Sequence, residues 1–173
     1  NASEILCASN FGPYGANPSY PCSPGAPCAG FPSTGSDMFH SCDPSIVYFN
    51  GTYFLYYTAS TNPTAVEGKA SKIFLATSTN GLTFTKYSNA NGPIPVIDYT
   101  GDQGAYGAGE ASVIVDNGKL VIYYTHAFAP DNQQIEQRRA TSTDGYNWTN
   151  DRVFQDGYRR TGTGSAIDLA GGL

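Results

Sequence analysis

The chain alternates short apolar runs with turn residues, and this pattern predicts an all-β protein. Residues 43–58 hold two β-rich runs on either side of Asn50-Gly51, and residues 110–125 hold two on either side of Asn117-Gly118. Asn-Gly between alternating apolar runs is the strongest short signal for a β-hairpin, because both positions of the turn need a positive φ. We therefore expect one antiparallel hairpin in each segment.

The two segments belong to an internal repeat. Residues 43–58 align with 110–125 at an offset of 67, and residues 76–84 align with 140–148 at an offset of 64. The second pair contains Ser-Thr-Asn-Gly or Ser-Thr-Asp-Gly before an aromatic residue, which predicts another strand, turn and strand. A unit of roughly 65 residues with four short strands is typical of a β-propeller blade. A β-sandwich is the alternative, although it does not explain the duplication.

Composition favours one domain and excludes several classes of function. Of the 173 residues, 40% are hydrophobic and 13% charged, with 13 Tyr, 9 Phe and 20 Gly, which argues against a helical bundle and against disorder. The net charge is -5 without a basic run, so nucleic acid is not an expected partner. No apolar stretch approaches 18 residues, so we expect no membrane partner.

The cysteines and glycosylation motifs favour a secreted, extracellular protein. All four cysteines lie in a Pro- and Gly-rich stretch, and two disulfides of undetermined pairing would give it shape. Zinc is the alternative, but the spacing lacks a close Cys pair. The expected disulfide residues are Cys7, Cys22, Cys28 and Cys42, and the expected glycosylation sites are Asn50 and Asn147. Asn1 is consistent with a mature N-terminus after removal of a signal peptide.

These patterns predict two parts of the chain. Residues 1–40 form an irregular, disulfide-tied segment, and residues 41–173 form the first two blades and the start of a third. Because a propeller needs at least four blades, we expect this chain to be an N-terminal portion of the ring. The remainder would come from another chain or a missing segment, and assembly of identical copies is left open.

Two carboxylates occupy the same place in the two repeats. Asp43 and Glu110 each precede the first apolar run, which is the innermost strand of a blade. The heads of inner strands face the funnel of a propeller, where carboxylates from different blades can meet. Such convergent carboxylates are the groups that general acid–base cleavage of a glycosidic bond requires. A turn at Asp43-Pro44 is the structural alternative.

Three motifs resemble known enzymes. His40-Ser-Cys-Asp-Pro-Ser-Ile-Val47, Tyr53-Phe-Leu-Tyr-Tyr-Thr58 and Ala76-Thr-Ser-Thr-Asn-Gly81 resemble five-bladed β-propeller glycosidases. The nearest are glycoside hydrolase family 43 and its relatives, which act on arabinan, xylan and similar glycans. The resemblance covers roughly residues 40–170. The Asn-Asp-Pro-Asn motif of the sucrose- and fructan-cleaving relatives is missing from this sequence.

The resemblance implies roles for individual residues. Asp43 matches the general base of the family, and Asp168 matches the second aspartate, which tunes the acid and orients substrate, although no Pro follows it. The general acid is a Glu on a later blade, beyond this chain. Glu110 is then a substrate-binding residue, together with His40, Tyr106 and His126. Tyr99, Phe128 and Trp148 could stack on sugar rings.

The resulting hypothesis is a secreted inverting glycosidase that hydrolyses plant or microbial polysaccharide of the arabinan or xylan type. A non-catalytic, lectin-like propeller that binds carbohydrate is the alternative. We expect no cofactor and no metal ligand set, with a structural calcium ion left open. The sugar, the linkage and the endo or exo mode depend on loops between blades and are not determined by these motifs.

Overall fold

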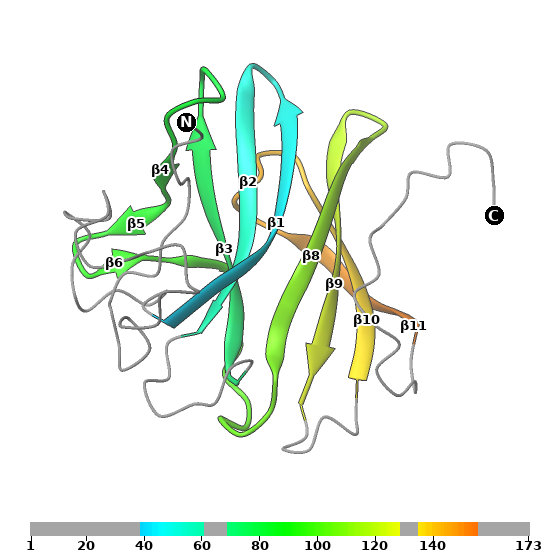
Figure 1. Ribbon diagram of the computed structural model, residues 1–173. Helices are drawn as coiled ribbons and strands as arrows, with labels where there is room; N and C mark the ends of the chain where they lie inside the picture. The colour runs from blue at the N-terminus through cyan, green and yellow to red at the C-terminus, as the bar shows by residue number, and fades with distance from the viewer. Residues whose placement is uncertain (1–38, 61–68, 129–134, 156–173) are drawn as a thin grey trace.

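A computed structural model describes residues 39–60, 69–128 and 135–155, and these form strands, turns and loops without a helix (Figure 1). Within those ranges, no helix is long and apolar enough to span a membrane. The predicted all-β fold class is confirmed.

The first repeat forms one antiparallel sheet. Its strands are β1 (Phe39–Phe49), β2 (Thr52–Ser60) and β3 (Ser71–Ser78), and two short strands, β4 (Thr85–Lys86) and β7 (Pro95–Ile97), pair with β3. The turn between β1 and β2 is the predicted Asn-Gly turn, with φ of 48° at Asn50 and 83° at Gly51. A separate ribbon of β5 (Ser88–Asn89) and β6 (Gly92–Pro93) lies at one side.

The second repeat forms a sheet of the same order. Strands β8 (Gly107–Asp116), β9 (Lys119–Ala127), β10 (Ile135–Ser142) and β11 (Thr149–Gln155) are each antiparallel to the next. The turn from β8 to β9 has φ of 48° at Asn117 and 72° at Gly118, close to the first turn. The predicted equivalence of the hairpins at 43–58 and 110–125 is therefore seen in strand order and turn geometry.

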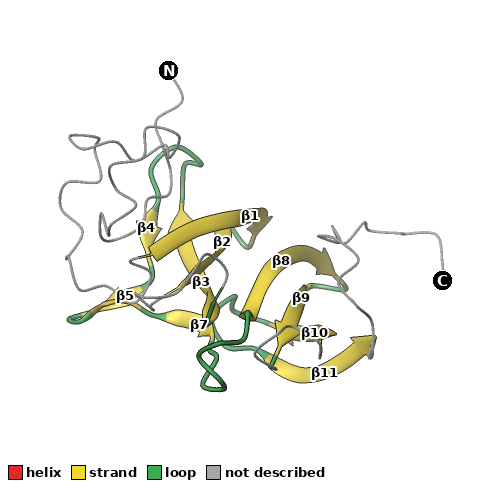
Figure 2. Cartoon of the chain, turned by 60° about the horizontal axis from the view of Figure 1, so that its bottom comes forward, coloured by secondary structure: helices red, strands yellow, loops and turns green. Residues whose placement is uncertain are grey.

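The two sheets pack face to face as adjacent propeller blades. Figure 2 shows β1 and β8, the first strand of each sheet, side by side, with the later strands extending away from them. A single parallel bridge, between Ser71 of β3 and Gly107 of β8, joins the sheets by hydrogen bonding. Gly107 has a φ of 91°, and a Cβ there would lie 2.7 Å from the backbone nitrogen of Ser71, so glycine permits this approach.

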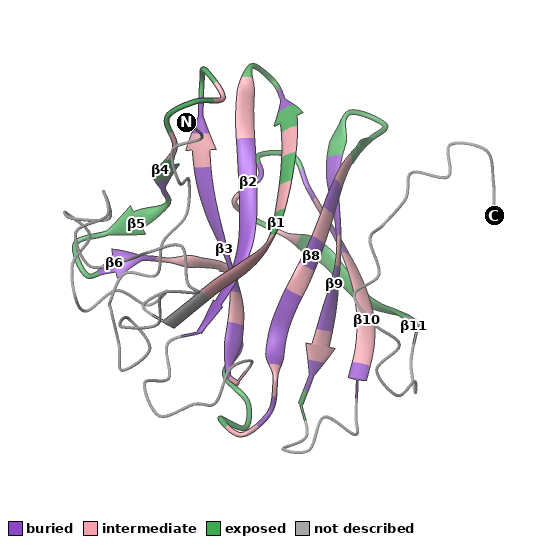
Figure 3. Ribbon diagram, in the orientation of Figure 1, coloured by how far each residue is buried: buried purple, intermediate pink, exposed green. Residues whose placement is uncertain are grey.

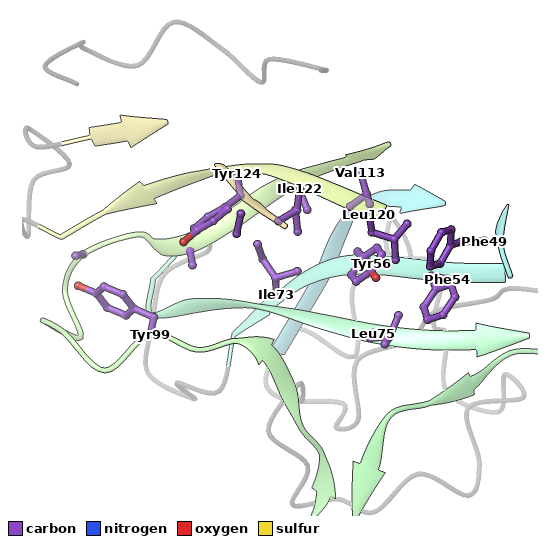
Figure 4. Close-up of a cluster of buried hydrophobic side chains, with 14 residues drawn as sticks. Phe49, Phe54, Tyr56, Ile73, Leu75, Tyr99, Val113, Leu120, Ile122 and Tyr124 are labelled. Atoms are coloured by element: carbon purple, nitrogen blue, oxygen red, sulfur yellow. The ribbon is translucent and has the colours of Figure 1, made fainter. Parts of the chain in front are cut away.

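The main core lies between the blades. Purple, buried positions follow β2 and β3 in the first sheet and β8 and β9 in the second in Figure 3, and Figure 4 shows side chains from both repeats in one cluster. Tyr56 of β2 donates from its hydroxyl to the carbonyl oxygen of Gly145 at 2.9 Å, and its ring meets Trp148 edge-on at 5.6 Å. Trp148, considered above for sugar stacking, thus packs against the core between the blades.

The second matching segments form the same turn twice. Ser78 Oγ accepts the backbone N–H groups of residues 80 and 81, and Asn80 Oδ1 accepts those of residues 82 and 83. Ser142 and Asp144 make the corresponding four bonds in the other blade. The Ser-Thr-Asn-Gly and Ser-Thr-Asp-Gly motifs are therefore local turn motifs.

Candidate active site

The two strand-head carboxylates lie on equivalent backbone irregularities. Asp43 has a φ of 50° and Glu110 a φ of 55°, values uncommon outside glycine. In both strands the pairing register shifts at this point, between Cys42 and Ser45 in β1 and between Gly109 and Ser112 in β8. A β-bulge redirects the side chain that it carries. The same bulge therefore presents a half-buried carboxylate in the first half of each inner strand, a few residues after its start.

Two hydrogen bonds join the blades next to these carboxylates. Ser45 Oγ accepts the backbone N–H of Val113 at 3.0 Å, which connects β1 to β8. Thr58 Oγ1, on β2, accepts the backbone N–H of Glu110 at 2.9 Å. The heads of β1 and β8 thus lie at the same end of the molecule, as Figure 1 shows.

Tyr106 lies against this junction. Its hydroxyl is hydrogen-bonded to the Thr58 hydroxyl, and a Cβ on Gly109 would collide with both Tyr106 and Thr58. Burial raises the pKa of Tyr106 far above its ordinary value, and the nearby Glu110 and Asp43 carboxylates raise it further. The phenol is therefore neutral and can donate a hydrogen bond beside two carboxylates. The structure brings Tyr106, Asp43 and Glu110 together.

Each carboxylate has a side-chain donor of its own. Cys42 Sγ donates to Oδ2 of Asp43 at 3.1 Å. Thr125 Oγ1 donates to Oε2 of Glu110 at 2.8 Å, and Gln137 Nε2 donates to Thr125 Oγ1 at 2.8 Å. Both carboxylates thus accept a hydrogen bond from a neighbouring side chain.

His126 belongs to a neighbouring cluster. Consecutive strand residues point to opposite faces, so Thr125 faces Glu110 while His126 faces away. The centroid of its ring lies 5.6 Å from that of Tyr99 and 5.7 Å from that of Phe128. Its Nδ1 lies 3.7 Å from Oε2 of Glu136. Burial, followed by the positive charge of Arg138, lowers the pKa of His126 and favours the neutral ring.

Other predicted residues fall partly or wholly outside the described structure. His40 lies in β1 near Asp43, but its side chain is not described. Asp168, Cys7, Cys22 and Cys28 lie outside the described ranges, so the second aspartate and the disulfides remain predictions. Asn50 and Asn147 are both exposed. Among described residues, no group of three or more His, Cys, Asp or Glu side chains could hold a metal.

Sequence reasoning missed three residues of this site: Thr58, Thr125 and Gln137. The two threonines end the matching Tyr-Tyr-Thr segments, so the repeat itself carried their signal, although it indicated only strand ends. Gln137 has no comparable signal, because its contact with Thr125 depends on the register in which β10 pairs with β9.

Comparison with known families identifies the fold family. Residues 40–161, most of the chain, match the family described as the glycosyl hydrolases family 32 N-terminal domain. The chain belongs to this family. The resemblance to five-bladed β-propeller glycosidases is confirmed. The specific expectation of family 43 is not confirmed, because the matching family is family 32. No curated protein sequence matches the chain.

Solved structures give the same fold for this family 32 domain. It is similar to a glycosyl hydrolase from Bacteroides ovatus, with 22% identity, a TM-score of 0.53, and 65% of this chain matching 31% of that one. It is also similar to a structure from the GH130 family of mannoside phosphorylases, which contains glycoside hydrolases that target β-1,2 mannosidic linkages in Candida mannan. The identity is 21%, the TM-score is 0.54, and 65% of this chain matches 31% of that one.

A third similar structure is the family 32 β-fructofuranosidase BmSUC1 of Bombyx mori in complex with sucrose, with 20% identity, a TM-score of 0.50, and 65% of this chain matching 22% of that one. The chain thus spans about a third or less of the length of these relatives. At these identities the likeness concerns the fold alone.

Proposed function

We propose that this chain contributes two blades to a glycoside hydrolase whose active site lies at the heads of β1 and β8. The observation that carries the proposal is the pair of equivalent bulges that present Asp43 and Glu110, with neutral Tyr106 beside them. Membership of a glycosyl hydrolase family supports it. A lectin-like propeller would need the same carbohydrate-binding end but no reactive carboxylate.

In this proposal Asp43 is the general base of an inverting reaction. Its carboxylate takes a proton from water as the water oxygen attacks the anomeric carbon. A carboxylic acid on the other face of the sugar protonates the leaving oxygen, at a separation of roughly 6.5–9.5 Å from the base in inverting enzymes. Asp168 is proposed to orient the substrate. We assign the acid to none of the described residues.

Glu110 has a binding role in this scheme. Thr125 donates a hydrogen bond to one oxygen of its carboxylate, and carboxylate oxygens can accept hydrogen bonds from the hydroxyl groups of a sugar. Tyr106 contributes a neutral donor, and His40 and His126 are further proposed contacts at the same end of the blades. Secretion, disulfides and glycosylation at the exposed Asn50 and Asn147 are part of the proposal.

The proposed substrates are polysaccharides of the arabinan or xylan type. The similar structures bring two other glycan classes into the test, since one is described for β-1,2 mannosidic linkages and another was solved with sucrose. A panel of 4-nitrophenyl arabinofuranoside, 4-nitrophenyl xyloside, β-1,2-mannobiose and sucrose covers these classes.

The deciding experiment replaces Asp43 with Asn in the protein that carries the complete propeller. We expect kcat to fall by about 10²–10⁴, the usual contribution of general-base catalysis, because the amide cannot accept the proton of water. The melting temperature should stay unchanged. Asp116→Asn, in the exposed turn at the opposite end of β8, is the matched control.

Full activity of Asp43→Asn on the panel would show that the base assignment is wrong. Saturable binding of the glycans by the wild-type protein without hydrolysis of any of them would favour the lectin-like alternative.

A further inference from the structure

Three side chains form a directed chain of hydrogen bonds across the second blade. Gln137 on β10 donates to Thr125 on β9, and Thr125 donates to Glu110 on β8. An amide nitrogen can only donate, so Gln137 occupies a lone pair of the Thr125 hydroxyl. The single hydroxyl proton is then directed at the Glu110 carboxylate. The direction of both bonds follows from the chemistry of the outer two groups.

The first blade contains the same threonine without this chain. Thr58 pairs across the strands with Ile73, whereas Thr125 pairs with Gln137. Ile73 offers no donor, and the Thr58 hydroxyl accepts the backbone N–H of Glu110 from the other blade. The amide at position 137 is therefore a specific feature of the second blade and not a requirement of the fold.

We propose that Gln137 is a positioning residue for ligand binding, which fixes the Thr125 proton on Glu110 and holds that carboxylate as an acceptor for sugar hydroxyl groups. The inference rests on the proposed function, because it assumes that this end of the blades binds carbohydrate. Hydrogen bonds to an ionised carboxylate are shorter and stronger than those between neutral groups. An orientation fixed in advance avoids part of the ordering cost of binding.

The first test replaces Gln137 with Ile, the residue that occupies the equivalent position in the first blade, so the fold should tolerate it. We expect KM for the hydrolysed member of the glycoside panel to rise about tenfold, because the Thr125 proton is no longer fixed on Glu110 and the hydrogen bonds that this charged group makes are weakened. The value of kcat should change less than about twofold, because the interaction is made with bound substrate and transition state alike.

Two threonine variants test the middle of the chain. Thr125→Val should raise KM as Gln137→Ile does, and Thr125→Ser should restore wild-type KM because it keeps the hydroxyl. Thr141→Val is the matched control, because Thr141 lies on β10 like Gln137, and its hydroxyl donates to the Thr149 carbonyl oxygen and accepts from the Asn150 amide. A rise in KM for Thr141→Val equal to that for Gln137→Ile would indicate a structural effect and overturn the assignment.

Gln137→Glu tests the direction of the hydrogen bonds. At neutral pH the introduced carboxylate accepts the Thr125 proton, which turns a hydroxyl lone pair toward Glu110, so KM should exceed that of Gln137→Ile. Protonation of the introduced group at lower pH makes it a donor, and its KM should then approach that of the wild type. If the ratio of the KM of Gln137→Glu to that of the wild type does not change with pH, the proposal is contradicted.

The failure of this inference is distinguishable from failure of the proposed function. If the wild type hydrolyses no glycoside of the panel, the catalytic proposal fails, and calorimetric affinity for the same four compounds replaces KM in every comparison. Unchanged KM or affinity in folded Gln137→Ile and Thr125→Val overturns the positioning role alone. Wild-type protein that neither binds nor hydrolyses any of the four overturns both.

Discussion

Single residues at the heads of β1 and β8 combine unusual backbone geometry with dense polar contacts. Asp43 and Glu110 have left-handed φ values in a protein where the other positive-φ residues lie mostly in turns. Backbone strain persists where the surrounding structure supports it, and it is concentrated at functional sites. Here the support comes from the Thr58 hydroxyl, which accepts the N–H of Glu110, and from Tyr106 beside it.

His126 should make stability depend on pH. Because its folded pKa lies below the ordinary value near 6.5, the unfolded chain binds a proton first as pH falls. The contribution of this residue to stability is therefore complete above about pH 6.5 and decreases below it. His126→Phe keeps the ring contacts with Tyr99 and Phe128 and should reduce the loss of stability between pH 7.5 and 5.5.

Urea denaturation of both proteins at the two pH values measures this difference. An equal loss of unfolding free energy in wild type and His126→Phe would mean that His126 does not govern the pH dependence.

At the scale of elements, each blade uses the same strand–turn–strand unit with one chemical change. The turn after β3 contains Asn80, and the turn after β10 contains Asp144, in the same network with a serine. Backbone and side-chain N–H groups of Asn147 hold the pKa of Asp144 well below its usual range. The first turn has no titrating group at this position.

The Asp144 turn should be destabilised by acid. A carboxyl whose folded pKa is depressed stabilises the protein above its unfolded pKa, about 3.9, and this contribution decreases as pH falls below that value. Asp144→Asn copies the first blade's turn and should lose less unfolding free energy than the wild type between pH 6 and pH 3. Thermal melts of the two proteins across this range test the prediction, and parallel curves would contradict it.

At the scale of the whole molecule, stability depends on the contact between blades. The hydrogen bond from Tyr56 to Gly145 and the edge-on contact of Tyr56 with Trp148 both connect one repeat to the other in a buried cluster. A single repeat has no partner for these groups, so each blade depends on its neighbour to cover its apolar face.

Tyr56→Phe should destabilise the protein by about 1–3 kcal/mol, because it leaves the buried Gly145 carbonyl without this donor while the ring remains. Tyr48→Phe is the control, since Tyr48 is exposed on β1. Chemical denaturation of the complete propeller measures both. Equal stabilities for the two variants would show that the bond between blades contributes little.

The sequence by itself determined the local structure and its duplication. Asn50-Gly51 and Asn117-Gly118 specify their turns through backbone preferences of those residues alone, and alternating apolar runs specify strands without reference to distant partners. The repeat alignment then placed Asp43 and Glu110 at equivalent strand heads, which the matching bulges confirm. All of these signals act over a few residues.

Only the tertiary structure decided how identical residues are used. Thr58 and Thr125 end the same Tyr-Tyr-Thr segment, yet one contacts the neighbouring blade and the other donates within its own blade. The difference arises from the cross-strand partner, Ile73 or Gln137, and from the position of each blade in the pair. A hydroxyl can turn toward either partner, so its direction is set by groups far away in sequence, which no local pattern specifies.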